Sequence, residues 1–349
     1  MEFGLFHEFQ RPPGASAETA FAQSFAQVDA AERWGLDAMW LAELHFAPER
    51  SVLASPLVLA AAIAQRTRRM KIGTAVQVLP LCHPLRLAEE AATVDQISEG
   101  RLIFGVGRSG FPRTYEAYGV PYAESRERFA ETLEIVKLAW TEERFSYRGK
   151  YFSYDNVALV PKPWQKPYPP IRIAATSPDT YAAIGALGHA AFVAARLGTL
   201  AELAPLVRSY RDAYKTAGHQ GSGEVYLRVP VYVAETEQQA RDEPEASIMN
   251  FFRYIGERVT ESATLAGARS IEERAERGQR LQTVNYDEAR RDKMIVGTPA
   301  SVIDRLMGLR ESIGLDGILA ELNPGGLIPQ ARVMNALRLL CQEVMPHFK

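Results

Sequence analysis

Two side chains that can handle a proton, Glu43 and His45, stand two positions apart just after a short apolar run. Imidazole has an ordinary pKa close to neutral pH, so histidine often moves protons in enzymes. A lone histidine is nevertheless more often a structural residue. If the apolar run is a strand that ends in a site, the position of His45 favours the catalytic interpretation.

Residues 105–110 form a glycine-rich run that contains Arg108. Glycine lets the backbone approach a ligand closely, and a guanidinium can donate two N–H groups to one anion. The run also fits the G-x-G-x-x-G pattern of dinucleotide sites, which requires a helix to begin at once. We expect an aromatic loop over 111–121 instead, with the next helix only from about Glu124. We therefore favour Arg108 as an anion ligand over a dinucleotide site.

Two predicted helix starts carry further groups that suit a phosphate. Ser125 and Arg126 begin one helix, and Ser177 and Thr180 begin the other. A helix N-terminus offers free N–H groups and a positive dipole end to an anion. Simple N-capping by Ser177, which contributes about 1 kcal/mol, explains the second start equally well. Both interpretations of that start remain open.

The hydrophobic pattern predicts a fold that would bring these residues together. Eight short apolar runs each precede a helical pattern, such as residues 17–34, where apolar side chains recur every three to four positions. This alternation predicts an α/β protein, a closed (β/α)8 TIM barrel. In such barrels the catalytic groups lie at the carboxyl ends of the strands, where His45 and Arg108 fall. The strands are expected to begin at Met1, Asp37, Lys71, Arg101, Ile171, Ala190, Val225 and Asp316.

The barrel is expected to be a single domain over residues 1–349, because no Pro-, Gly- or Ser-rich linker divides the chain. Its pattern is interrupted by insertions after strand 4, at 144–170, and after strand 7, at 235–293. The first contains a hairpin pattern followed by a proline-rich stretch. The second is charged and weakly periodic, and we predict an inserted lid there.

Charge balance and cysteine content exclude several classes of protein. The 349 residues include 40 Lys and Arg against 42 Asp and Glu, a net charge of −2, whereas nucleic-acid binders usually show a basic stripe. The two cysteines, Cys82 and Cys341, are far apart and lack metal-ligand spacing. No signal-peptide pattern opens the sequence, and no apolar stretch is long enough to span a bilayer. We expect a cytoplasmic protein that uses no metal and acts on a small molecule.

Motifs along almost the whole chain resemble the bacterial luciferase-like, flavin-dependent monooxygenase family. Each motif is weak alone, but together they are specific to the family. The chain departs from the family pattern at Leu44. In the light-emitting subunit, which the chain otherwise resembles, this position holds the first of two paired histidines. Long-chain aldehyde chemistry is therefore not expected. The motifs occupy residues 3–6, 34–37, 40–46, 72–76, 83–90, 95–101, 296–299 and 344–348.

The resemblance implies a cofactor, a partner and a reaction. The barrel would bind reduced FMN (FMNH2), supplied by a separate flavin reductase, and would use O2 as co-substrate. A C4a-(hydro)peroxyflavin would then oxidise a small, partly apolar organic substrate. The resemblance also implies a homodimer. Two alternatives stay open, namely an F420-dependent hydride-transfer oxidoreductase and a non-catalytic flavin-binding partner subunit.

The resemblance also carries over to individual residues. His45, next to Glu43, resembles the active-site histidine, and Thr74 and Ala75 resemble the segment beneath the flavin ring. The anion candidates found above resemble the residues that bind the phosphate and the ribityl chain of the flavin in the family. These candidates are Arg108, Arg126, Ser177 and Thr180. Because ligand sites are mostly apolar, aromatic residues near the rim are expected to wall the substrate pocket. These residues are Phe6, Phe46, Phe111, Tyr115 and Phe251.

Overall fold

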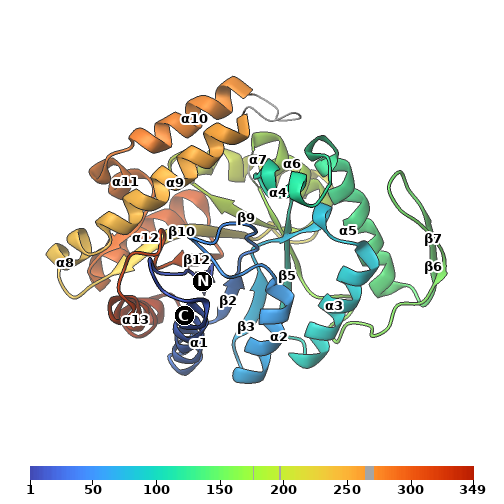
Figure 1. Ribbon diagram of the computed structural model, residues 1–349, viewed down its shortest axis with the longest axis horizontal. Helices are drawn as coiled ribbons and strands as arrows, with labels where there is room; N and C mark the ends of the chain where they lie inside the picture. The colour runs from blue at the N-terminus through green and yellow to red at the C-terminus, as the bar shows by residue number, and fades with distance from the viewer. Residues whose placement is uncertain (176, 196–197, 264–270) are drawn as a thin grey trace.

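Eight parallel strands form a closed barrel, with helices around it (Figure 1). The computed structural model describes the whole chain except residues 176, 196–197 and 264–270. Every neighbouring pair in the ring is parallel, and β12 closes it between β10 and β1. The barrel strands are β1 (Glu2–His7), β2 (Ala38–Leu41), β3 (Lys71–Thr74), β5 (Leu102–Gly107), β8 (Ile171–Ala174), β9 (Ala190–Ala194), β10 (Val225–Val233) and β12 (Gly317–Glu321). The predicted (β/α)8 TIM barrel is confirmed.

Helices pack against the outside of the barrel through their apolar faces. Several begin with proline in the first turn, where the missing N–H costs no hydrogen bond. Within the described part of the chain, no helix is long and apolar enough to cross a membrane. The helices of the outer layer are α1 (Ala17–Arg33), α2 (Pro56–Arg66), α3 (Pro84–Ile97), α5 (Ser125–Thr141), α6 (Pro178–Leu187), α7 (Leu203–Thr216), α12 (Pro299–Ile313) and α13 (Gln330–Leu339).

Trp40 fills the barrel interior between β1 and β3. A Cβ on Gly4 would lie 2.1 Å from the Trp40 indole nitrogen, and one on Gly73 would lie 2.2 Å from the far edge of the same ring. The Arg172 guanidinium stacks on Tyr226, 3.4 Å from its ring centre, and pairs with Glu2 at 2.7 Å. Side chains therefore fill the barrel interior towards the amino-terminal ends of the strands. A ligand site must lie at the opposite opening of the barrel, which we call the carboxyl-terminal mouth.

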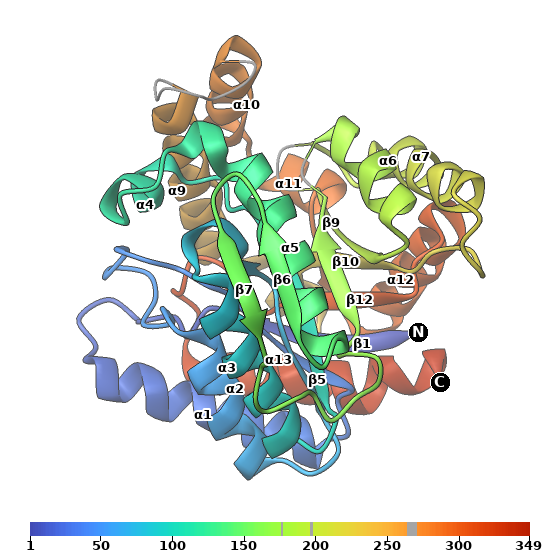
Figure 2. The same ribbon diagram turned by 90° about the vertical axis from the view of Figure 1, so that its right-hand side faces the viewer.

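The two insertions differ in kind. In 144–170 the predicted hairpin is present as β6 (Phe145–Arg148) and β7 (Ser153–Val157). In 235–293 the described residues are largely helical, as α8 (Glu237–Asp242), α9 (Glu245–Ala263), α10 (Ile271–Thr283) and α11 (Tyr286–Asp292), before the short strand β11 (Ile295–Gly297). Helices α9, α10 and α11 share a second apolar core, whereas Ala240 of α8 belongs to the main core. Figure 2 shows α9 and α10 beside α4 (Pro112–Ala117) at one end of the barrel.

Helix α4 corrects one expectation. We predicted an aromatic loop over 111–121, with a helix only near Glu124, but a six-residue helix begins at Pro112. The sequence signal was present, because proline is favoured at the first position of a helix. The aromatic residues of this stretch led us to expect a loop. In the structure, Phe111 contacts the second apolar core and Tyr115 is buried. Tertiary contacts therefore stabilise a helix that is too short to form alone.

Candidate active site

Glu43 and His45 follow β2 at the carboxyl-terminal mouth. Together with Tyr118 they form a hydrogen-bonded chain in which His45 lies between the other two residues. His45 Nε2 lies 2.8 Å from Glu43 Oε1, and the Tyr118 hydroxyl lies 3.2 Å from His45 Nδ1. Because a carboxylate can only accept, Nε2 donates to Glu43 and Nδ1 is left to accept from Tyr118. Burial raises the pKa of Tyr118, and the nearby Glu43 adds to that shift. The three residues thus form a chain that can hold and pass a proton.

The carboxylate of Glu43 is fixed by two further donors. Its Oε2 accepts from Gln77 Nε2 at 2.6 Å and from the Val78 backbone N–H at 2.8 Å. Gln77 and Val78 form β4 (Gln77–Val78), which pairs with the end of β5. Sequence reasoning missed Gln77 and Tyr118. A polar side chain just after the third strand could have drawn attention to Gln77, but no local pattern places Tyr118 against His45.

Thr74 and Ala75 lie where β3 ends, next to the glycine-rich run. The Thr74 hydroxyl donates to the Gly105 carbonyl at 2.6 Å, and the Ala75–Val76 peptide bond is cis. A Cβ on Gly105 would lie 1.8 Å from the Thr74 carbonyl oxygen, and one on Gly107 would lie 2.5 Å from Val76. The first two glycines of the run are therefore explained by close packing of β5 against this segment.

Arg108 follows β5 and is half-buried. It donates to the Ser125 hydroxyl at 3.1 Å, and it forms no ion pair with any residue that the structure describes. Burial lowers its pKa, and the neighbouring Arg126 lowers it further. The Tyr115 hydroxyl donates to the Arg108 carbonyl, which holds this part of the loop in place. A partly buried cation with a neutral partner is stabilised by an added anion.

Arg126, Ser177 and Thr180 lie around the same point. Arg126 pairs with Asp179 at 2.8 Å, and both side chains are partly exposed. Ser177 and Thr180 form a capping box at the start of α6, so N-capping is present there. We call Arg108, Ser125, Arg126, Ser177 and Thr180 the anion cradle. With Asp179, the cradle has two positive charges and one negative charge.

The five predicted pocket aromatics lie in different environments. Phe251 lines a pocket together with Phe252. Phe6 is buried beneath Arg228, and Tyr115 is buried beside Tyr122. Phe46 is exposed against Tyr118 and His45, and Phe111 packs against the second apolar core. Their role as substrate contacts stays a prediction.

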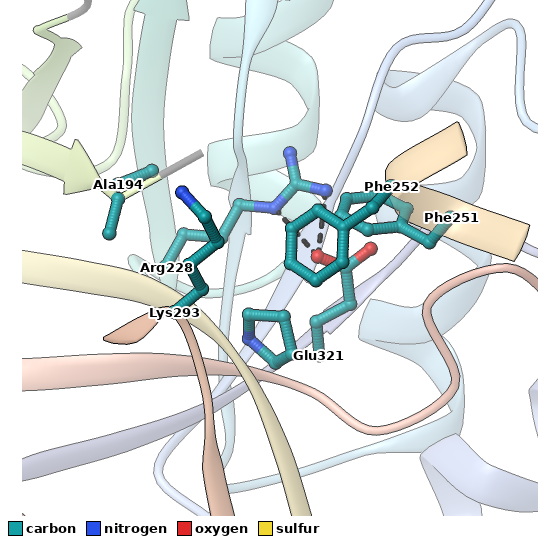
Figure 3. Close-up of a pocket in the computed structure, with 8 residues that line it drawn as sticks. Ala194, Arg228, Phe251, Phe252, Lys293 and Glu321 are labelled. Atoms are coloured by element: carbon teal, nitrogen blue, oxygen red, sulfur yellow. Dashed lines mark hydrogen bonds and ion pairs between the residues drawn. The ribbon is translucent and has the colours of Figure 1, made fainter. Parts of the chain in front are cut away.

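A buried charged cluster at the mouth was not predicted. The side chain of Arg228 on β10 donates to Glu321 at 2.8 Å and to Glu8 at 3.2 Å, and Arg50 binds the same Glu8 at 2.7 Å (Figure 3 shows Arg228 and Glu321). Both carboxylates are only 1% exposed. Glu8 directly follows β1 and Glu321 is the last residue of β12, and an acidic residue at such a position is the signal that could have revealed them. We call Glu8, Arg50, Arg228 and Glu321 the charged quartet.

The anion cradle and the charged quartet occupy opposite walls of one mouth. The cradle follows β5 and β8, whereas the quartet is built mainly on β1, β10 and β12. No group of His, Cys, Asp and Glu among the described residues could hold a metal ion.

The profile of the luciferase-like monooxygenase family matches residues 1–317. The chain belongs to this family. It is an oxidoreductase, as its relatives named as monooxygenases are.

The relatives of this luciferase-like monooxygenase include named oxygenases. The oxygenase component of the flavin-dependent trigonelline monooxygenase of Acinetobacter baylyi is 28% identical, over 100% of this chain and 96% of that protein. A monooxygenase from Streptomyces bottropensis, of known structure, is 27% identical with a TM-score of 0.81, and the match covers both chains fully. Both relatives are thus named as monooxygenases, and the name of the first also states flavin dependence.

More distant structures share the fold alone. The oxygenating constituent of 3,6-diketocamphane monooxygenase from Pseudomonas putida, solved with FMN, superposes with a TM-score of 0.82 at 22% identity over 99% of this chain and 98% of that chain. The coenzyme F420-dependent tetrahydromethanopterin reductase of Methanopyrus kandleri superposes with a TM-score of 0.74 at 20% identity, over 100% and 99%. Proteins with this fold thus include one solved with FMN and one named as dependent on coenzyme F420.

Proposed function

We propose that this luciferase-like monooxygenase is the oxygenase component of a two-component system. It takes reduced FMN from a separate flavin reductase and uses O2 to oxidise a small, partly apolar organic substrate. The observation that carries the proposal is the half-buried Arg108, which lies near Arg126 and the start of α6 and has no carboxylate partner of its own among the described residues. The name of the Acinetobacter relative, an oxygenase component, supports a separate reductase.

The anion cradle fits the phosphate of FMN. Arg108 supplies a desolvated guanidinium, and Arg126 adds a second once it leaves Asp179. The start of α6, a helix of 10 residues, adds the positive end of its dipole and the hydroxyls of Ser177 and Thr180. From this anchor the flavin ring would reach the segment of Thr74 and Ala75. Bound reduced flavin supplies the electrons that activate O2, so that one oxygen atom enters the substrate and the other leaves as water.

The protein's own contribution is to position groups and to control a proton. Glu43, held by Gln77 and Val78, fixes the tautomer and orientation of His45. Tyr118 is 46% exposed and contacts the other ring nitrogen, so it connects His45 to solvent. We assign His45 the role of holding or moving a proton at Nδ1, and Glu43 and Tyr118 the role of positioning it.

The helices of 235–293 are proposed to cover the substrate. Phe251 and Phe252 on α9 line the pocket at the mouth, and Arg113 of α4 pairs with Glu261 of α9 at 3.5 Å. Residues 264–270 of this segment lie outside the described residues. A cover of this kind excludes water from the reacting groups.

Flavin binding tests the proposal directly. Photoreduced FMN should bind to the purified protein, and its reoxidation by O2 should pass through a protein-bound species with near-ultraviolet absorbance that free flavin lacks. Reoxidation that follows free-flavin kinetics would contradict the proposal. Titration with F420 tests the hydride-transfer alternative, which tight binding of F420 without binding of FMN would favour. Unchanged turnover in His45→Ala would favour a non-catalytic flavin-binding subunit.

A further inference from the structure

Three rings, those of His45, Phe46 and Tyr118, are in mutual contact at the carboxyl-terminal mouth. The ring centres of Phe46 and Tyr118 lie 5.8 Å apart, and the ring centre of His45 lies 5.8 Å from Phe46 and 5.2 Å from Tyr118. Phe46 is 68% exposed and Tyr118 is 46% exposed, so solvent reaches a large part of both rings. We call Phe46 and Tyr118 the aromatic patch. A ligand has room to stack on it, directly beside His45.

Phe46 is held in this position at a cost to the fold. Its φ is +56°, in the left-handed region that bulky residues rarely adopt. Because most of its side chain is exposed, the burial of apolar surface offsets little of this cost. An unfavourable backbone conformation beside a candidate catalytic group points to a role other than folding. For an exposed ring that touches His45, contact with a ligand is such a role.

The charge behind the aromatic patch is negative. Glu43 is bound by His45, by a side-chain amide and by a backbone N–H, and no described lysine or arginine pairs with it. His45 is neutral when its Nε2 donates to Glu43 and its Nδ1 accepts from Tyr118, so it does not offset this charge. Burial raises the pKa of Tyr118, Glu43 and Cys82 add to the shift, and no described cation opposes it.

The cations near the mouth are engaged elsewhere. Arg228 lies over Phe6, 3.5 Å from the ring centre, and Arg113 of α4 pairs with Glu261 at 3.5 Å. No arginine or lysine of the described residues lies over a ring of the aromatic patch. The patch therefore offers free ring faces next to an uncompensated carboxylate. Proteins bind organic cations with this combination of groups.

We propose that the substrate carries a cationic nitrogen, as in an alkylated pyridinium or a quaternary ammonium group, that binds against the rings of Phe46 and Tyr118. This inference rests on the proposed function, because it names the substrate class for that reaction. The ring faces attract the cation, and the charge of Glu43 stabilises it through the field rather than by contact. The bound group would lie beside Nδ1 of His45, while the flavin phosphate takes the anion cradle.

Three probes of one shape separate the effect of charge from the effect of stacking. 1-Methylnicotinamide is a cation, 3-methylbenzamide is its neutral isostere, and 3-methylbenzoate is an anion of the same outline. Their dissociation constants are measured by calorimetry, with and without FMN, so that no turnover is needed. We expect the cation to bind about fivefold to thirtyfold more tightly than the neutral amide, because each exposed ring adds a cation–π contact. The anion should bind most weakly, because Glu43 repels it.

Substitutions assign this preference to the aromatic patch. Phe46→Leu keeps an apolar side chain but removes one ring face, so the preference for the cation should fall about twofold to fivefold. Phe46→Tyr should keep the preference, and Glu43→Gln should lower it because the negative charge is gone. Trp164→Leu is the matched control, because Trp164 is 55% exposed but lies in the insertion of 144–170. It should leave the preference unchanged.

Several results would overturn the proposal. These are equal binding of the cation and the neutral amide, tighter binding of the anion, binding of none of the three probes, and an unchanged preference in Phe46→Leu. If Phe46→Leu does not fold, Tyr118→Leu removes the other ring face and carries the same expectation.

The outcome for the proposed function is read separately. A preference for the cation without binding of FMN would leave the organic-cation site standing and contradict the flavin proposal. Binding of FMN without any preference for the cation would contradict only the organic-cation site.

Discussion

The Arg126–Asp179 pair would compete with the phosphate that we propose for the anion cradle. Its atoms lie 2.8 Å apart, but the two side chains are 38% and 53% exposed, so the pair adds less than about 1 kcal/mol to stability. Hydrogen bonding from Ser177, and then the contact with Arg126, lowers the pKa of Asp179, which is therefore a charged competitor for Arg126. Binding of a phosphate must overcome this weak competition.

Opposite effects on FMN affinity are expected from the two halves of that pair. Arg126→Ala should raise the Kd for FMN about tenfold or more, because a charge-assisted contact is lost. Asp179→Asn should lower the Kd severalfold, because Arg126 is freed. Quenching of flavin fluorescence measures both. Arg66→Ala, which breaks an equally exposed pair with Asp29, is the control and should change nothing. Unchanged affinity in Arg126→Ala would remove Arg126 from the site.

Tyr118 is predicted to position His45. Tyr118→Phe removes the hydrogen bond to Nδ1, which contributes on the order of 1 kcal/mol. Bound reduced FMN should then react with O2 less productively, and release of hydrogen peroxide should rise about threefold to tenfold while the Kd for FMN stays the same. A coupled peroxidase assay measures the release. Tyr214→Phe, which removes an exposed bond to a backbone carbonyl, should leave it unchanged. A matching rise in that control would contradict the assignment.

At the scale of elements, α9 and α10 approach each other at two glycines. A Cβ on Gly256 would lie 2.8 Å from the Gly278 carbonyl oxygen, and one on Gly278 would lie 2.8 Å from the Thr260 nitrogen. Glycine is unfavourable within a helix by about 1 kcal/mol relative to alanine. These glycines are therefore explained by close contact between the two backbones, which builds the second apolar core above the mouth.

Gly256→Ala should therefore loosen this pair of helices although alanine favours helix. We expect faster amide hydrogen exchange in α9 and α10, and a lower free energy of unfolding by about 1–3 kcal/mol, because an added methyl group overpacks the contact. Gly308→Ala in α12 is the matched control, because nothing lies within 4 Å of its added Cβ. That variant should gain up to about 1 kcal/mol. A stabilised Gly256→Ala would show that the helices are not tightly packed.

At the scale of the whole molecule, two buried histidines couple stability to pH. Burial lowers the pKa of His7 and of His189 to about 4. Between pH 6.5 and 4 the unfolded chain binds protons that the folded chain does not, so the free energy of unfolding falls as the pH falls through this window. Each histidine contributes up to about 3 kcal/mol of that loss. The full stability is present above about pH 6.5.

His7→Asn should flatten this dependence. The Asn oxygen can still accept the Phe9 N–H that now donates to His7 Nδ1, while the titrating group is gone. Urea unfolding at a series of pH values should show a loss between pH 6.5 and 4 that is smaller by up to about 3 kcal/mol. His347→Asn, at an exposed position, should leave the wild-type slope unchanged. An unchanged slope in His7→Asn would mean that His7 does not titrate in this window.

The sequence alone predicted the barrel, because the spacing of apolar residues that indicates a strand or a helix is a local property. Each of the eight strand–helix units shows this spacing within its own residues. It also placed Glu43, His45 and Arg108 directly after strands and Arg126 at the start of a helix, because both kinds of position are marked locally. The functional roles of these residues stay predictions. It missed α4, whose stability comes from contacts of Phe111 and Tyr115 with distant residues.

Only the tertiary structure decided which ends of strands meet. Glu8, Arg50, Arg228 and Glu321 are far apart along the chain, and Arg228 and Glu8 are 220 positions apart. Their contact exists because β12 closes the ring between β10 and β1, and no local pattern encodes which strands become neighbours. The same closure places the anion cradle opposite the charged quartet. The sequence therefore determined which groups are available for chemistry, and the closure of the barrel decided which of them act together.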